Sequence, residues 1–257
     1  MKPFEDYQKP IKQGKRFLGF LGDSYRDYLA ARILFNNNQL IQACCLANTS
    51  IEKFLKALID SEGNKPKFTH NLIDLLSKIE KYNLEELNAD FLNVITKIYS
   101  SRYIGDCDTG YNMVIVKNKF LAELDYVYSI LEPKLRLLKT DTKQVANSRY
   151  EIDLSMQNSA LLMNNYILLG INKTTFIEQL DFVSELRMHN HSVMEVTYST
   201  NESKNDAIFD FESLKPNGNE NRSFKTCYRA DSVKEDLVFI INGHYLNRGN
   251  YLSRKPR

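Results

Sequence analysis

The sequence is poor in cysteine, has no tryptophan and shows no strong excess of charge. Four of its 257 residues are cysteines, and 34 lysines and arginines against 32 aspartates and glutamates leave a net charge of +2. No C-x-x-C pair occurs, so the cysteines suggest neither a disulfide framework nor a zinc knuckle. The near balance of charge excludes a global basic field. Any contact with nucleic acid must therefore come from a local patch.

Long apolar segments are also missing. No run of about 18 apolar residues occurs, so the sequence predicts no transmembrane helix and no membrane partner. Residues 1–16 are polar and charged without an apolar core, which argues against a secretory signal. The expected compartment is therefore the cytoplasm. The hydrophobic share of 43% is ordinary and is enough to build a folded core.

Residues 22–139 have the apolar spacing of a helical bundle. In the best-defined helix the stripe recurs every three or four positions, the period of a buried face: Ile41, Cys44, Asn48, Ile51, Leu55 and Leu58. A preceding helix is expected to stop at residues 36–38. Further helices are expected at 72–79, 83–98 and 113–138. Asn83 and Glu86 form a capping-box-like start, and Pro133 should kink or end the last helix.

The pattern changes after the polar stretch 140–150, which suits a linker. Residues 174–188 have helical spacing, and residues 157–169 fit a strand or a helix equally. Four segments rich in β-branched and aromatic residues are expected to be strands: 193–198, 207–211, 224–228 and 237–241. The expected class is α+β. Its parts are an extension (1–21), an all-α up-down bundle (22–139), the linker (140–150) and a mainly antiparallel α+β domain of unknown type (151–257).

Three short motifs follow one another in the first half. They are Glu52-Lys-Phe-Leu-Lys-Ala-Leu58 on a helix, Phe68-Thr-His-Asn-Leu72 before the next helix, and Ser101-Arg-Tyr-Ile-Gly-Asp106 after the one that follows. Together they resemble the HEPN domain, over about residues 20–139. The resemblance implies a bundle of four or five helices that pairs as a homodimer. It also implies a tie to nucleotides or RNA in a bacterial defence or stress setting.

The RNA-cleaving branch of that family carries an Arg followed, after roughly four to six residues, by a His. The His would move a proton from the ribose 2′-hydroxyl while the Arg stabilises charge on the phosphate. No Arg stands at that offset before any of the four histidines: His70, His189, His191 and His244. The chain therefore looks more like the non-nuclease branch, which accompanies minimal nucleotidyltransferases or sits in large multidomain proteins. We expect no catalytic residue, no cofactor and no metal, and the resemblance implies a nucleotidyltransferase partner.

Two lysines on the second expected helix are candidate phosphate ligands. Lys53 and Lys56 could contact phosphate from one edge of that helix. Glu52 stands four residues before Lys56, so an ion pair on a solvated face is the alternative. Both interpretations stay open, and both lysines belong to the predicted nucleotide- or RNA-binding set.

His70, Arg102 and Tyr103 occupy the motif positions and complete that set. His70 stands at the start of a helix, where backbone N–H groups favour anions; capping or packing is the alternative role. Arg102 and Tyr103 offer a guanidinium fork and a stacking ring to a nucleotide. In the alternative, Arg102 ties the helix end to Asp106 or Asp108. Tyr103 is then a core residue.

Two other clusters have less specific patterns. His189 and His191 would share one face of a strand, but the spacing shows no third ligand, so a structural role is favoured over a metal site. The last residues include a basic group: Arg248, Arg254, Lys255 and Arg257. It could bind an RNA backbone, and a frayed terminus explains it equally.

Three functions remain open. The first is a nucleotide- or RNA-binding module, the interpretation that we favour. The second is a metal-independent RNase with a non-standard site, in which His70 or His191 is the base. The third is a protein-interaction domain in which the bundle only dimerises.

Overall fold

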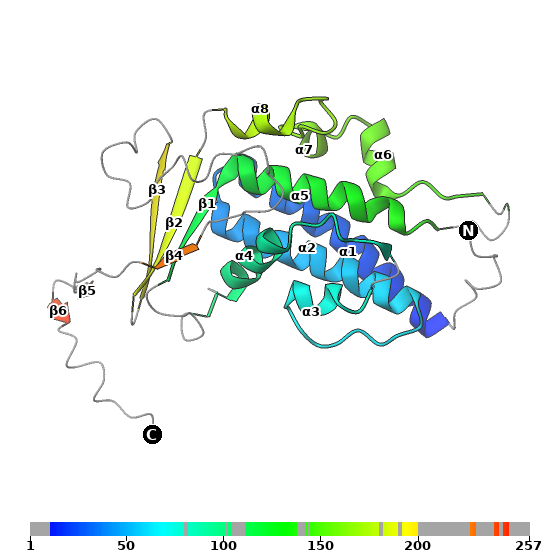
Figure 1. Cartoon of the computed structure of the whole chain (residues 1–257), viewed down its shortest axis with the longest axis horizontal. Coiled ribbons are helices and arrows are strands. Elements are labelled where there is room, and N and C mark those ends of the chain that lie inside the picture. The colour runs from blue at the N-terminus through cyan, green and yellow to red at the C-terminus, as the bar shows by residue number, and fades with distance from the viewer. Residues whose placement is uncertain are drawn as a thin grey trace, which may run out of the picture.

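Two long antiparallel helices form the centre of the molecule. The computed structural model describes residues 11–79, 82–100, 102–103, 111–137, 142, 144–179, 182–189, 192–199, 227–229, 239–241 and 244–246. Helix α1 (Ile11–Asn36) is followed after a tight turn by α2 (Leu40–Ser61), and the two run side by side (Figure 1). Ser24 and Ser50 lie between them, and each hydroxyl donates to the other residue's carbonyl oxygen at 2.8 Å. Because these side chains are small and fully hydrogen-bonded, they can be buried between the two helices without cost.

Three further helices pack on this pair. The short α3 (Leu72–Leu76) and α4 (Ala89–Ser100) contact α2, whereas α5 (Lys117–Leu131) contacts both α1 and α2. Their apolar faces form one core, whose aromatic members include Phe35, Phe54, Phe91 and Phe120. Helix α5 ends where Pro133 enters a 3₁₀ turn, η4 (Glu132–Lys134), because proline cannot continue the helical hydrogen bonding. The helical N-terminal half predicted from the sequence is confirmed.

An antiparallel sheet lies at one end of the helices (Figure 1). Its strand order is β3-β2-β1-β4, built from β1 (Tyr111–Val116), β2 (Phe182–His189), β3 (Ser192–Ser199) and β4 (Cys227–Arg229). Ile115 on β1 pairs with Ser184 on β2, which in turn pairs with Thr197 on β3. A separate two-stranded ladder joins β5 (Phe239–Ile241) to β6 (His244–Leu246). The predicted α+β class with antiparallel strands is confirmed.

Residues 148–177 pack against the helices. They contain α6 (Arg149–Ser155), α7 (Ser159–Leu162) and α8 (Lys173–Ile177). The core continues through Leu161, Phe176 and Leu186. Contacts therefore cross the expected linker at residues 140–150. That residues 22–139 and 151–257 are separate folding units stays a prediction, which a cleavage experiment can test.

One buried arginine connects the two parts of the chain. Arg32 on α1 has no exposed side-chain surface, forms an ion pair with Asp125 on α5 and donates from Nε to the carbonyl oxygen of Ala160 at 3.0 Å. It also donates to the carbonyl oxygen of Met163. A buried guanidinium is tolerated only where its donors are matched in this way. Arg32 therefore fixes α7 against α1 and α5.

Some element assignments made from the sequence were wrong. Residues 113–116 belong to strand β1 and not to the start of the last helix, and residues 182–188 belong to strand β2 and not to a helix. In both places the apolar spacing fits either period, and pairing between strands decides the outcome. Helix α4 begins after Asn88, whose Oδ1 accepts from the backbone N–H groups of Asp90 at 3.1 Å and Phe91 at 3.2 Å. Asn83 is therefore not its cap.

The predicted strand positions agree better with the structure than these helix assignments do. Residues 193–198 lie within β3, and 224–228 and 237–241 overlap β4 and β5. Residues 207–211 lie outside the described residues. The ambiguous stretch 157–169 forms the short α7 and successive turns.

Candidate functional site

Glu52 is the centre of the predicted site. It lies on α2, and its side chain is only 8% exposed. Its Oε1 accepts from Lys56 Nζ at 2.6 Å, and its Oε2 lies 2.9 Å from His70 Nδ1. One buried carboxylate thus joins two predicted binding residues that are 14 positions apart in the sequence. Lys56 therefore takes the i,i+4 ion pair that was the alternative to direct phosphate contact.

The carboxylate fixes the orientation of the His70 ring. Since an ionised carboxylate only accepts hydrogen bonds, Nδ1 carries the proton and donates it to Glu52. The hydroxyl oxygen of Tyr99 lies 3.3 Å from the same nitrogen. Nε2 has no hydrogen-bond partner among the residues described, and the side chain is 48% exposed. The ring therefore offers an unoccupied nitrogen at the surface.

The backbone around His70 is fixed by neighbouring polar side chains. Asn71 caps the five-residue α3, and its Oδ1 accepts from the N–H groups of Ile73 at 3.0 Å and Asp74 at 3.3 Å. His70 is thus not the cap, and these N–H groups are already used, so the start of α3 offers no anion site. The carbonyl oxygen of His70 accepts from Asn48 Nδ2 at 3.4 Å. Asn48, fully buried within the apolar stripe, therefore anchors His70 to α2.

Arg102 lies over the ring of Tyr99 immediately after α4. Its guanidinium carbon is 3.3 Å from the centroid of the Tyr99 ring and 5.2 Å from that of Tyr103. Its Nε donates to the carbonyl oxygen of Tyr99 at 2.9 Å. Burial raises the pKa of Tyr99, although the positive Arg102 opposes this effect. The cation–π contact and the hydrogen bond together hold the guanidinium plane in one orientation.

Tyr103 is a surface residue. Its side chain is 61% exposed, so the alternative that it belongs to the core is wrong. The other alternative, in which Arg102 pairs with Asp106 or Asp108, involves residues outside the described part of the chain. Ring and guanidinium contacts thus run from His70 through Tyr99 and Arg102 to Tyr103, since the His70 and Tyr99 ring centroids are 5.0 Å apart.

Lys53 has a different environment. Its Nζ donates to Asp27 Oδ2 on α1 at 2.7 Å, so it joins the two central helices and does not contact the Glu52 carboxylate. Of the five predicted residues, the structure links Lys56, His70, Arg102 and Tyr103 in one chain of contacts. Sequence reasoning missed Tyr99 and the bridging role of Glu52. The signal for Tyr99 was its position three residues before Arg102, the spacing at which side chains on a helix end meet.

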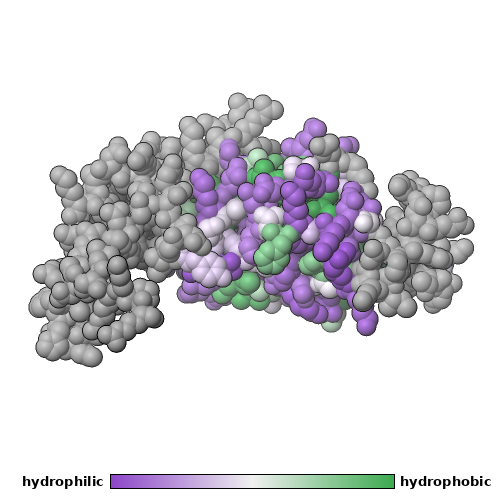
Figure 2. Space-filling model, turned by 90° about the horizontal axis from the view of Figure 1, so that it is seen from below, coloured by the Kyte–Doolittle hydropathy of each residue, from purple (hydrophilic) through white to green (hydrophobic). Residues whose placement is uncertain are grey.

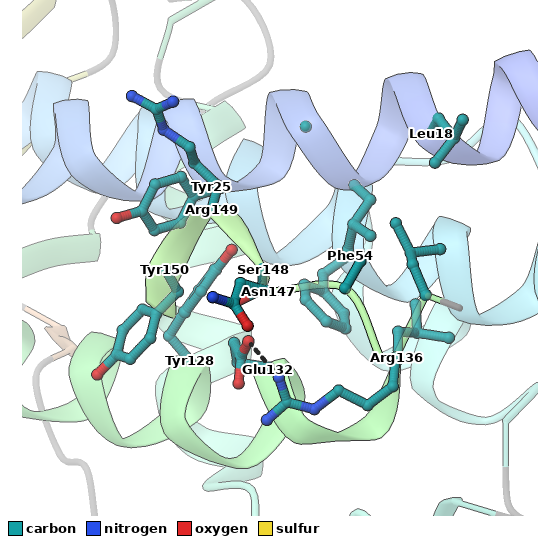
Figure 3. Close-up of a pocket in the computed structure, with 15 residues that line it drawn as sticks. Leu18, Tyr25, Phe54, Tyr128, Glu132, Arg136, Asn147, Ser148, Arg149 and Tyr150 are labelled. Carbon is teal, nitrogen blue, oxygen red and sulfur yellow. Dashed lines mark hydrogen bonds and ion pairs between the residues drawn. The ribbon is translucent and has the colours of Figure 1, made fainter. Parts of the chain in front are cut away.

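A cavity of about 200 Å³ lies elsewhere, between α1, α2, α5 and residues 146–150. Figure 3 shows Tyr25, Tyr128 and Tyr150 on one side of it and Phe54 on another. Two arginines line it, and one of them, Arg136, pairs with Glu151 at 2.8 Å and Glu132 at 3.4 Å. None of the predicted site residues lines it.

Neither a metal-ligand cluster nor a helix that could span a membrane occurs among the described residues. Within that part of the chain, no cluster of three or more His, Cys, Asp or Glu side chains is placed to hold a metal ion. His189 ends β2, whereas His191 and the basic residues 248–257 fall outside the described ranges. Among the described helices, none has the length and apolarity needed to cross a membrane.

Comparison with known proteins finds one family that matches part of the helical half. The HEPN domain family matches residues 20–112, which include most of α1, all of α2, α3 and α4, and every predicted site residue. No curated protein and no solved structure matches the chain. The resemblance inferred from the three motifs is therefore confirmed.

Proposed function

Starting from the HEPN match of residues 20–112, we propose that this chain is a nucleotide- or RNA-binding module of the non-nuclease branch. The observation that carries the proposal is the row of His70, Arg102 and Tyr103, held together by Glu52 and Tyr99. Such a row combines a cation with exposed rings, which are the groups that contact phosphates and bases.

The electrostatics of this row favour an anion. The Glu52 carboxylate is offset by Lys56, so Arg102 supplies the net positive charge beside His70. A guanidinium held in one plane loses little conformational entropy on binding and presents a planar fork to phosphate. A local positive site of this kind can attract a nucleotide even though the whole chain carries only +2.

Titration with ATP and with a short RNA tests this function. The comparison is between the wild-type chain, Arg102→Ala and the control Arg26→Ala, which removes an exposed guanidinium from α1. We expect Arg102→Ala alone to weaken binding, by roughly 10-fold for loss of a charge-assisted hydrogen bond. Affinity should also fall with rising salt. Equal binding by all three proteins, or none by any, would remove the nucleotide site.

The same geometry carries a second candidate function, metal-independent RNA cleavage. A carboxylate that accepts from Nδ1 leaves Nε2 of His70 as a base, the arrangement that orients histidines in acid–base catalysis. We nevertheless expect cleavage of single-stranded RNA to be weak or absent, because no Arg stands at the nuclease offset from any histidine. Robust cleavage in EDTA that disappears in His70→Ala would replace the binding function with catalysis.

The remaining parts of the proposal rest on the family resemblance. The chain would act in the cytoplasm as a homodimer, in a defence or stress system, with a nucleotidyltransferase as its partner. Light scattering on the purified chain tests the dimer. A dimer that binds neither ATP nor RNA would favour the interaction-domain alternative.

A further inference from the structure

The connection between α2 and α3 displays an aromatic side chain without burying it. Phe68 is 98% exposed and projects from residues 62–71, two positions before His70. Its ring centroid lies 6.0 Å from that of His70 in an edge-to-face arrangement. Phe68 therefore extends the row of rings described above by one member, and its other surfaces face solvent.

The same connection carries two exposed cations. Lys65 and Lys67 lie on either side of Pro66, and neither side-chain ammonium forms a hydrogen bond or ion pair with the residues that the structure describes, although the Lys67 carbonyl accepts from Thr69 N at 3.1 Å. The acidic residue of this segment, Glu62, stands at its beginning, where α2 ends. Residues 65–68, the tip of this connection, therefore combine positive charge with an apolar ring. Figure 2 shows the molecule from below, the side on which α3 lies, where a few hydrophobic side chains stand among hydrophilic ones.

Both ends of this connection are fixed to the helices. Gly63 has a φ of 85°, a left-handed conformation that glycine adopts without strain, and the N–H of Asn64 donates to the carbonyl oxygen of Ile59 at 3.2 Å. At the other end Thr69 Oγ1 accepts from Asn71 N at 3.1 Å. The tip is thus presented on a fixed frame, which lowers the entropy cost of binding.

We propose that residues 65–68 form a grip for single-stranded RNA, in which Phe68 stacks on an unpaired base and Lys65 and Lys67 contact the neighbouring phosphates. This inference rests on the proposed function and names its ligand class. Aromatic rings interleaved with lysines are the usual means of holding a single strand. The RNA would continue from Phe68 along His70 to Arg102 and Tyr103.

The arrangement discriminates against other nucleic-acid ligands. A mononucleotide has one base and cannot occupy the exposed rings at both ends of the row, Phe68 and Tyr103, at once. A duplex keeps its bases stacked inside the helix, so Phe68 would have no face to stack on. Affinity should therefore rise with oligonucleotide length from one to several nucleotides and fall when the strand is paired.

Fluorescence anisotropy with labelled oligoadenylates of one to eight nucleotides and with a duplex tests the grip. The proteins are the full chain, Phe68→Ala and the control Leu18→Ala, which removes another apolar side chain, 51% exposed, from α1. We expect Phe68→Ala to weaken binding of the eight-nucleotide strand roughly 10-fold. Its effect on ATP should be much smaller, and Leu18→Ala should change neither.

Salt dependence tests the two lysines. The double variant Lys65→Ala/Lys67→Ala should reduce the slope of log affinity against log salt by about 1.4, the value for two phosphate contacts to a single strand. Lys15→Ala, on the exposed start of α1, is the control and should leave the slope unchanged.

The outcomes separate this inference from the function on which it rests. If wild-type chain binds no nucleic acid, the proposed function itself fails. If Arg102→Ala weakens binding while Phe68→Ala and the double lysine variant bind the strand normally, the site stands and the grip is overturned. A change in oligomeric state in Phe68→Ala, with RNA affinity unchanged, would also overturn it and make Phe68 a contact between proteins.

Discussion

At the scale of single residues, a few buried polar side chains set the geometry of the exposed ones. Glu52 orients His70, and Asn48 holds the backbone of the same residue. Asn48 Oδ1 also accepts from Thr96 Oγ1 on α4 at 3.2 Å. The amide thus joins α2, His70 just ahead of α3, and α4. An unpaired amide at this buried position would be costly, so these bonds specify how the three segments meet.

Replacing Asn48 tests this anchoring. We expect Asn48→Ala to lower the free energy of unfolding by about 1–3 kcal/mol, because the carbonyl of His70 loses its Asn48 donor and the Thr96 hydroxyl keeps only its bond to the carbonyl of Leu92. RNA affinity should fall as well, since His70 is no longer held. Thr49→Ala is the control, because its hydroxyl only returns to Cys45 on the same helix. Urea unfolding measures the difference, and equal loss in both variants would count against an anchoring role.

The residue scale also shows how far the site was predictable. The motifs brought His70, Arg102 and Tyr103 into consideration because each carries a group suited to a nucleotide. The pairing of Glu52 with His70 was not predictable, since it spans 18 positions and depends on how α3 approaches α2. Lys53 and Lys56 looked equivalent in the sequence. Their different partners, Asp27 and Glu52, became visible only when α1 was placed beside α2.

At the scale of elements, helix periodicity predicted the bundle well, and strand pairing was the main source of error. The buried stripe of α2 lies on the predicted face of the helix. Apolar residues that recur every three or four positions fit a helix and not a strand. Short segments such as Tyr111–Val116 fit either period. Their conformation depends on partners far away in the chain, here β2 and β4.

The tyrosine cluster between α1, α5 and α6 gives an element-scale prediction about pH. Burial raises the pKa of Tyr150 to about 12, and burial also raises the pKa values of three neighbouring rings above the ordinary value of 10: Tyr25, Tyr28 and Tyr128. Between about pH 10 and 12 the unfolded chain therefore binds fewer protons than the folded one. The free energy of unfolding must then fall as pH rises.

Urea unfolding between pH 8 and 11 measures this effect. The stability that these rings contribute is fully present below pH 10 and should be lost above it. Tyr150→Phe, which cannot ionise, should show a shallower decline than wild type. Tyr103→Phe is the control, because Tyr103 is exposed. Identical declines in wild type and Tyr150→Phe would contradict the account.

At the scale of the whole molecule, the two halves of the chain share one core. The hydroxyl of Tyr25 donates to Asp153 Oδ2 at 2.9 Å, and Arg32 donates to carbonyl oxygens in and after α7. The sequence predicted a polar linker from its composition. The sequence contained no signal for these contacts, because the pattern of an amphipathic helix does not distinguish a buried arginine from an exposed one.

Limited proteolysis tests how the halves are joined. We expect cleavage within residues 140–147 to be tolerated. The two fragments should nevertheless elute together in size-exclusion chromatography and separate only in denaturant, because Arg32 and Tyr25 hold the second half. Fragments that separate under native conditions would support two independent domains, with the first ending close to Lys139.

We propose that the row from Phe68 to Tyr103 is an RNA-binding surface. Photocrosslinking of a single-stranded RNA containing 4-thiouridine, followed by mass spectrometry of the crosslinked peptides, tests it most directly. We expect crosslinks in the peptides that contain Phe68 to His70 and Tyr99 to Tyr103, and their loss on competition with unlabelled single strand. Crosslinks confined to residues 140–257, or none at all, would contradict it.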